Sequence, residues 1–175
     1  MVKKDICIGE TPCEFVQIGI VVKDLDRTVK MLSEIFGMGP FRMITYPPGG
    51  PEEAGLTLRG APAQFSHRLA FTNLGPIELE IVQPLTGEST LTEFLDEHGE
   101  GIQHIRFNVD ELQPVMDYLS TKGIQPLMAG HGIRQGTQWA HLDSADKVGF
   151  TVEIMNVLPN TDGRTPQFVN EKVDE

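Results

Sequence analysis

The chain has 175 residues, of which 39% are hydrophobic and 22% charged, a composition typical of a globular protein. Its formal net charge of -11 argues against nucleic acid and against an anionic membrane surface as partners, because both are bound through clustered Lys and Arg. No apolar run reaches the roughly 18 residues of a membrane-spanning helix, and no apolar segment follows the two N-terminal lysines. We therefore expect a cytoplasmic protein with neither nucleic acid nor membrane as a partner.

The chain contains two cysteines, Cys7 and Cys13. Two such residues form neither a disulfide framework nor a complete zinc-thiolate site. We interpret them as reduced thiols.

An internal repeat organises the chain. Residues 15–24 and 102–110 align on Gln17 and His104, and each continues with Ile, any residue, an apolar residue and a Val shortly before an Asp. The alternation of polar and apolar positions predicts a strand in each segment. The acidic residues that follow, Asp24 or Asp26 in the first copy and Asp110 in the second, are suited to cap a helix.

The predicted elements of the first half follow in chain order. After the strand at 15–24, apolar spacing predicts an amphipathic helix at about 26–36, with Val29, Leu32, Ile35 and Phe36 on its buried face and an end at Gly37. Three strands are predicted at about 41–46, 66–72 and 76–83. Residues 47–64, rich in Pro and Gly, separate the first two of these strands as a long loop.

The second half repeats this order. Residues 85–100 contain a short capped helix and link the halves. A strand at 102–110, a helix at about 111–122 ending at Gly123, and strands at about 125–129, 137–142 and 149–156 follow. From about residue 159 the chain is polar, and we expect this tail to be poorly ordered unless it docks on a partner subunit.

The order β-α-β-β-β occurs twice and predicts an α+β fold with mostly antiparallel sheets. We expect a single domain over 1–175. Its parts are repeat one at about 15–84, the linker helix at 85–100, repeat two at about 101–157 and the polar tail at 158–175.

Four polar residues lie inside otherwise apolar strands: Gln17, Glu80, His104 and Glu153. A carboxylate at a core-facing position is costly unless it is paired or bound to a metal ion. The four residues fall on the first and last strands of the two repeats, so a pseudo-two-fold arrangement brings them to one cavity. One imidazole with oxygen ligands suits one divalent cation: zinc, nickel, cobalt or manganese, with iron(II) less favoured.

Residues 15–157 resemble the vicinal oxygen chelate superfamily, which includes glyoxalase I, extradiol dioxygenases and antibiotic-resistance proteins. The most specific stretch is 77–110, which carries a strand ending in Gln-Pro-Leu, a Ser-Thr/Phe-Leu linker helix and the strand entry Gly-Glu-Gly-Ile-Gln-His. Methylmalonyl-CoA epimerase-like members are the most similar branch. The resemblance implies a curved sheet around a metal-binding cavity, and a homodimer.

The resemblance also implies a ligand set. The family's metal ligands fall on Gln17, Glu80, His104 and Glu153, with Glu78 as the second choice for Glu80. A set of this kind is similar to that of zinc-type glyoxalase I. Two departures limit the likeness.

The residues that bind glutathione in glyoxalase I are replaced here by Val21 and Pro84. The additional glutamate of the epimerases is replaced by Arg68, between His67 and Leu69. Glutathione dependence is therefore not expected, and methylmalonyl-CoA itself is not favoured as the substrate.

The activity that the resemblance implies is proton transfer next to the carbonyl of a small acyl compound, for which a CoA thioester is one candidate, by a metal-dependent epimerase, isomerase or glyoxalase-like lyase. Glu80 and Glu153 are the expected acid and base. His67, Arg68 and His141 are candidate substrate contacts. A non-heme iron dioxygenase and a non-catalytic binding protein of the resistance type are the alternatives.

Overall fold

A computed structural model of the chain describes residues 6–52 and 54–157. The first half contains the short β1 (Cys7–Ile8) and then one βαβββ unit. The elements of this unit are β2 (Thr11–Val21), α1 (Leu25–Phe36), β3 (Arg42–Tyr46), β6 (Ser66–Leu74) and β7 (Ile77–Thr86). The predicted helix and strands of repeat one are all present.

The linker between the halves contains α2 (Thr90–His98). The second βαβββ unit then follows, with a four-residue helix before its last strand. Its elements are β8 (Gly101–Val109), α3 (Leu112–Thr121), β9 (Pro126–His131), β10 (Gln138–Leu142), α4 (Ala145–Val148) and β11 (Thr151–Asn156). The α+β fold and its duplication are confirmed.

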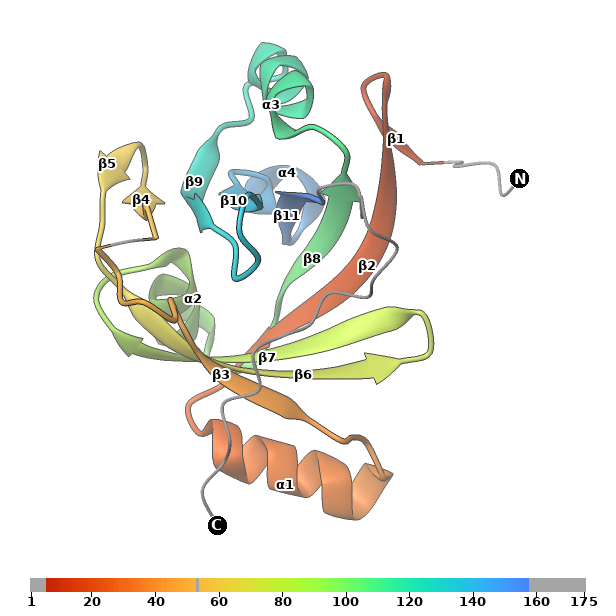
Figure 1. Cartoon of the computed structure of the whole chain (residues 1–175), viewed down its shortest axis with the longest axis vertical. Helices are drawn as coiled ribbons and strands as arrows, with labels where there is room; N and C mark the ends of the chain where they lie inside the picture. Colours follow the sequence, from red (N-terminus) through yellow and green to blue (C-terminus); the bar gives the residue numbers. More distant parts are fainter. Residues whose placement is uncertain (1–5, 53, 158–175) are drawn as a thin grey trace.

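The strands form one curved sheet, in which equivalent strands of the two halves follow in the same order outward from the centre (Figure 1). Its order is β3-β6-β7-β2-β8-β11-β10-β9, and β2 pairs antiparallel with β8 at the centre. Within each half, the first strand pairs in parallel with the last, as β2 does with β7 and β8 with β11, and the other pairs are antiparallel. The centre of the sheet is therefore made of the four strands that carry the candidate ligands.

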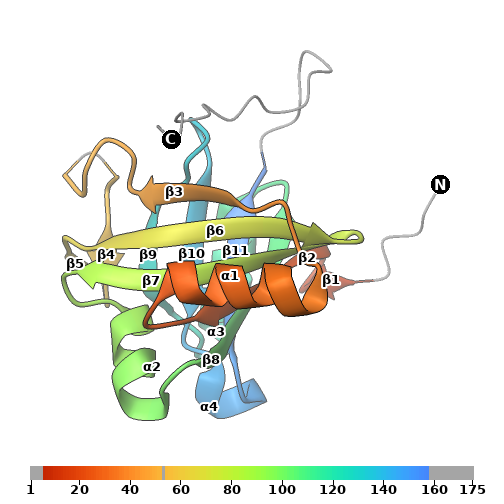
Figure 2. The same cartoon turned by 90° about the horizontal axis from the view of Figure 1, so that it is seen from below.

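Period-2 alternation decides which side chains face the inside of the curve. On β7, Leu79 and Ile81 pack outward in the core cluster beneath α1, whereas Glu78 and Glu80 face the cavity. On β11, Ile154 packs outward in the cluster beneath α3, and Glu153 faces the cavity. Both helices thus lie on the convex face of the sheet, and the concave face is left for the site (Figures 1 and 2).

The buried face of α1 is shorter than its apolar pattern predicts. Val29 and Leu32 pack against the core beneath the helix, but Ile35 and Phe36 are 64% and 66% exposed. The helix ends as predicted at Gly37, whose φ of 66° is the left-handed conformation that glycine adopts at low cost.

The two repeat helices begin differently. The Asp24 carboxylate caps α1 by accepting a hydrogen bond from the backbone N–H of Arg27 at 2.9 Å. The prediction that Asp110 caps α3 is wrong, because the N-cap position is Glu111, whose side chain makes no capping hydrogen bond.

The long loop at 47–64 is partly structured. It contains the two-residue strands β4 (Thr57–Leu58) and β5 (Ala61–Pro62), and β4 pairs with β9 at the end of the sheet. The polar tail lies outside the described residues. Across 6–52 and 54–157, none of the helices has the length and hydrophobicity that crossing a bilayer requires.

The different helix starts predict different sensitivities to alanine. Asp24→Ala removes the acceptor for the Arg27 N–H and should lower the free energy of unfolding by about 1 kcal/mol. Glu111→Ala is the matched control, since no capping bond is lost, and should change it by less than about 0.5 kcal/mol. Urea denaturation of both variants measures the difference, and equal losses would contradict the assignment of the caps.

Candidate metal centre

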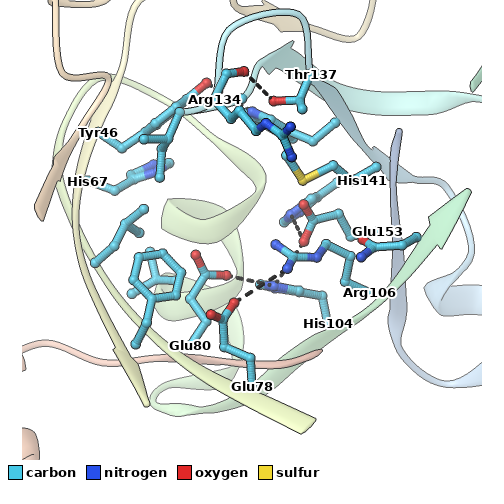
Figure 3. A pocket seen from close by; sticks show the side chains of 18 of the residues that line it. Tyr46, His67, Glu78, Glu80, His104, Arg106, Arg134, Thr137, His141 and Glu153 are labelled. Carbon is cyan, nitrogen blue, oxygen red and sulfur yellow. Dashed lines mark hydrogen bonds and ion pairs between the residues drawn. The ribbon is translucent and has the colours of Figure 1, made fainter. Parts of the chain in front are cut away.

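The concave face of the sheet surrounds a cavity of about 240 Å³. Side chains from both halves line it, and one side gathers Glu78, Glu80, His104, Arg106, His141 and Glu153 (Figure 3). The labelled residues are Tyr46, His67, Glu78, Glu80, His104, Arg106, Arg134, Thr137, His141 and Glu153. The cavity is therefore a polar centre with apolar walls, the arrangement typical of small-molecule sites.

Two rows of paired residues build the charged side. In one row, Glu80 on β7 pairs with Gly19 on β2, which pairs with His104 on β8. In the neighbouring row, the register runs across the sheet through Glu78, Gln17, Arg106, Glu153 and His141. Residues far apart in sequence thus become neighbours through strand register alone.

Gly19 makes room for His104. A Cβ at this position would overlap the imidazole ring of His104, which lies directly over the glycine. Because Gly19 has no side chain, the ring can rest against the strand and direct one nitrogen into the cavity. The requirement here is for space, since the backbone of Gly19 is not among those with positive φ.

A hydrogen-bond chain orients the His104 ring. The Gln103 amide nitrogen donates to Thr151 Oγ1 at 3.1 Å, which turns the Gln103 carbonyl oxygen toward His104 Nδ1 at 2.8 Å. A carbonyl oxygen only accepts, so Nδ1 carries the proton and donates. In the neutral ring the lone pair of Nε2 therefore faces the cavity, as a metal-binding imidazole requires.

Two carboxylates converge on that nitrogen. Glu80 Oε2 lies 3.1 Å from His104 Nε2, and Glu153 Oε2 lies 3.3 Å from it. These atoms are all electron-pair donors, so a proton or a cation among them is needed to make the cluster favourable. His141 Nε2 lies 3.8 Å from the same Glu153 oxygen.

The electrostatics of the buried cluster agree with this need. Burial raises the pKa of Glu153 to about 7, and Arg106 and His104 oppose the rise while Glu80 and Glu78 add to it. Burial also lowers the pKa of His141 well below its usual value, with further lowering by His104 and His67. Without a cation, Glu153 thus tends to hold a proton near neutral pH, whereas His141 stays neutral and able to bind a metal.

A divalent cation fits the side chains present. His104, His141 and Glu153 each offer one ligand atom, all within 4.8 Å of one another, and all three residues are buried. Outside this group of three, Glu80 adds a carboxylate oxygen 3.1 Å from the same nitrogen, His104 Nε2. Two imidazoles with carboxylate oxygens suit zinc and the neighbouring divalent transition metals.

The expected ligands lie on the same face of the sheet, but their contacts differ. Glu80, His104 and Glu153 are in mutual contact through the His104 nitrogen. Gln17 is fully buried, and its amide nitrogen donates to Glu78 at 2.7 Å. Its carbonyl oxygen is buried with no hydrogen-bond partner among the described residues.

Two of the three expected substrate contacts line the cavity. His67 and His141 face inward, and His141 comes close enough to Glu153 to serve as a ligand, a role that the sequence did not predict. The prediction that Arg68 contacts substrate is wrong. Arg68 follows His67 on β6 and so points to the convex face, where it forms a bidentate ion pair with Asp26 of α1.

Comparison with known proteins agrees with the duplicated fold and its site. The model of the Glyoxalase/Bleomycin resistance protein/Dioxygenase superfamily matches residues 16–142. The chain belongs to this superfamily. Members of the superfamily bind a divalent metal, and the matched segment of this member includes Gln17, Glu80, His104 and His141.

Solved structures share the fold at low sequence identity. A methylmalonyl-CoA epimerase from Mycobacterium tuberculosis is 19% identical with a TM-score of 0.63, covering 89% of this chain and 95% of that one. A Streptomyces coelicolor methylmalonyl-CoA epimerase in complex with 2-nitronate-propionyl-CoA is 23% identical with a TM-score of 0.59, covering 81% and 95%. A hypothetical protein from Bacillus halodurans C-125 is 20% identical with a TM-score of 0.61, covering 90% and 99%.

One curated relative is the uncharacterized protein YqjC of Bacillus subtilis (strain 168), 35% identical over 57 residues. That match covers 33% of this chain and 41% of the relative, so the superfamily member described here spans less than half of YqjC.

Gly19 provides a direct test of how the centre is built. Gly19→Ala should displace the His104 ring, weaken Co²⁺ binding by at least about tenfold, and lower the free energy of unfolding by about 1–3 kcal/mol through overpacking. Gly101→Ala is the control on the adjacent strand, because a Cβ there meets open space. Calorimetric titration with Co²⁺ and urea denaturation measure both effects, and a Gly19→Ala variant with unchanged Co²⁺ affinity would contradict this construction.

The buried His67 ring predicts a titration anomaly. Burial lowers the pKa of His67 to about 4, and Glu80 opposes the shift only in part. The unfolded chain therefore binds this proton more strongly, so His67 lowers stability as pH falls from 6.5 toward 4. In proton NMR, the His67 ring signal is assigned as the one that the His67→Gln variant lacks. Its chemical shift in the wild-type protein should stay constant between pH 5.5 and 8. A midpoint near 6.5 is the contrary result.

Proposed function

We propose that this protein is a metal-dependent enzyme that moves a proton next to the carbonyl group of a small acyl compound. The observation that carries the proposal is the meeting of Glu80 and Glu153 at one imidazole nitrogen inside a small cavity. A divalent cation held there by His104, His141, Glu153 and Glu80 would act as a Lewis acid on the carbonyl oxygen and stabilise an enolate. Gln17 is proposed as a further ligand, through the side-chain carbonyl oxygen for which the described residues offer no hydrogen-bond partner.

The two carboxylates are proposed as acid and base as well as ligands. Glu80 comes from the last strand of the first half and Glu153 from the last strand of the second, so they approach His104 from opposite halves. One carboxylate can remove a proton from the carbon next to the carbonyl, and the other can return one.

The rest of the cavity supports a small, partly apolar substrate. Leu69, Val82 and Met128 line its walls, and the neutral His67 offers a hydrogen-bonding group without a charge. Structurally similar methylmalonyl-CoA epimerases bind acyl-CoA compounds, methylmalonyl-CoA in one complex and 2-nitronate-propionyl-CoA in another. We propose an acyl thioester or a 2-oxo compound as the substrate class for this chain. We propose the cytoplasm as the compartment in which the enzyme acts.

One observation favours a second candidate, an iron(II) dioxygenase. His104, His141 and Glu153 form a set of two histidines and one carboxylate, the combination that non-heme iron oxygenases use with open positions for oxygen. His141 supplies the second histidine that the first strand lacks. Iron in the purified protein together with oxygen consumption would favour this reading over proton transfer.

The test is exchange of the carbon-bound proton in deuterated water. Metal-loaded protein should incorporate deuterium next to the carbonyl of at least one member of a panel of acyl thioesters and 2-oxo compounds. Glu153→Gln should lower the exchange rate by at least about 100-fold, since a positioned base contributes that much. Glu14→Gln, on an exposed position of β2, is the control and should exchange at the wild-type rate.

Metal content measured on the same samples separates the roles of Glu153. Glu153→Gln protein that retains its metal and exchanges at the wild-type rate would contradict the assignment of Glu153 as a base. Ligand binding without exchange across the whole panel would instead indicate a non-catalytic binding protein.

A further inference from the structure

Arg106 is a charged side chain inside the cavity that the proposed proton transfer does not use. It lies on β8 two residues after His104, on the same face, and pairs in register with Gln17 on one side and Glu153 on the other. When the two repeats are superposed on Gln17 and His104, the counterpart of Arg106 is Gly19. The second half therefore projects a guanidinium group where the first half has no side chain (Figure 3).

The hydrogen bonding of Arg106 is incomplete. Its Nε is buried and has no partner among the described residues. The ion pair from its Nη2 to Glu78 is 3.4 Å long, whereas Arg59 and Arg68 hold their carboxylates with two bonds each of 2.7–2.8 Å. Glu78 is also occupied by the Gln17 amide at 2.7 Å. A buried donor of this kind calls for an acceptor that enters with a ligand.

Formal charges in the cavity favour an anionic ligand. Three carboxylates, Glu78, Glu80 and Glu153, and three guanidinium groups, Arg42, Arg106 and Arg134, line it and balance one another. A divalent cation at the centre would leave the cavity with an excess of two positive charges. A substrate carboxylate would offset one of these positive charges, and enolate formation would leave the total unchanged because the proton passes to a carboxylate of the cavity.

We infer that Arg106 binds a carboxylate of the substrate, through the edge formed by Nε–H and one terminal N–H. That edge matches a carboxylate with two parallel hydrogen bonds. The side chain lines the cavity and is 17% exposed, so a ligand can contact the guanidinium group, and a small rotation of that group would present the buried Nε–H to the same ligand. The inference rests on the proposed function only for the position of the carbonyl group, near His104.

Strand geometry sets the length of the ligand. Residues two apart on a strand are about 6–7 Å apart on the same face. A carbonyl group near His104 and a carboxylate at Arg106 are thus separated by a spacer of two or three carbons. The substrate class is an acyl compound with a carboxylate at that distance, in which Arg106 determines specificity and does not transfer the proton.

The test compares ligands that differ only in the distal carboxylate. Co²⁺-loaded protein is titrated calorimetrically with 2-oxoglutarate and 2-oxovalerate, and with 2-oxoadipate and 2-oxohexanoate. The members of each pair share the end that meets the metal. In at least one pair, wild-type protein should bind the dicarboxylate at least about tenfold more tightly.

The variants identify Arg106 as the cause. Arg106→Met keeps the length of the side chain without its charge, and should bring the ratio of affinities close to one. Arg106→Lys keeps the charge but not the two parallel N–H groups, and should leave a preference for the dicarboxylate of about threefold. Arg68→Met is the matched control, because Arg68 lies on the convex face paired with Asp26, and should keep the wild-type ratio.

The outcomes separate this inference from the proposed function. A wild-type preference that persists in Arg106→Met overturns the inference, as does a wild-type protein that binds neither dicarboxylate or prefers neither. Cobalt absorbance checks that each variant carries the same metal load. A preference that Arg106→Met abolishes stands even if no compound exchanges its proton in deuterated water, and in that case only the enzymatic proposal fails.

Discussion

The position of the His104 imidazole is the constraint on which the rest of the site depends. The ring lies over Gly19, where no side chain competes for the space, and Gln103 fixes its tautomer through Thr151. One nitrogen is therefore directed at carboxylates from both halves of the chain. Strand register and the missing side chain of Gly19 thus bring the buried residues Glu80, His104, His141 and Glu153 together.

Duplication explains the frame of the site but not its chemistry. Gln17 corresponds to His104 and Glu80 to Glu153, and these four lie on the central strands. The other inward positions break the symmetry, because the register partner of Glu80 is Phe71 whereas that of Glu153 is His141. Gly19 likewise corresponds to Arg106. The second half thus carries more of the candidate metal-binding groups, while the first contributes space and an apolar wall.

The fold was predictable because the repeat is visible in the polar and apolar alternation of its strands. The same alternation places Glu80, His104 and Glu153 on the concave face. His141 as a candidate metal ligand next to Glu153 was not predictable from the repeat, since the corresponding residue of the first half is Phe71. The prediction that Arg68 contacts substrate was wrong because adjacent residues of a strand point to opposite faces of the sheet. Since His67 faces the cavity, Arg68 faces away from it.

Other differences between prediction and structure have local causes. Ile35 and Phe36 continue the apolar pattern of α1 but remain exposed, so periodicity alone overestimated the buried face. Arg106 could have been identified by aligning the repeats, where it stands opposite Gly19. Arg106 Nε and the Gln17 carbonyl oxygen lack a hydrogen-bond partner within 6–52 and 54–157, and this depends on side-chain positions that no sequence pattern specifies.

The most direct test of the cation centre is a crystal structure of protein loaded with Co²⁺, with diffraction collected on both sides of the cobalt absorption edge. We expect one anomalous peak in bonding contact with His104 Nε2 and a Glu153 oxygen. A peak elsewhere on the chain, or no peak in cobalt-containing crystals, would contradict the account.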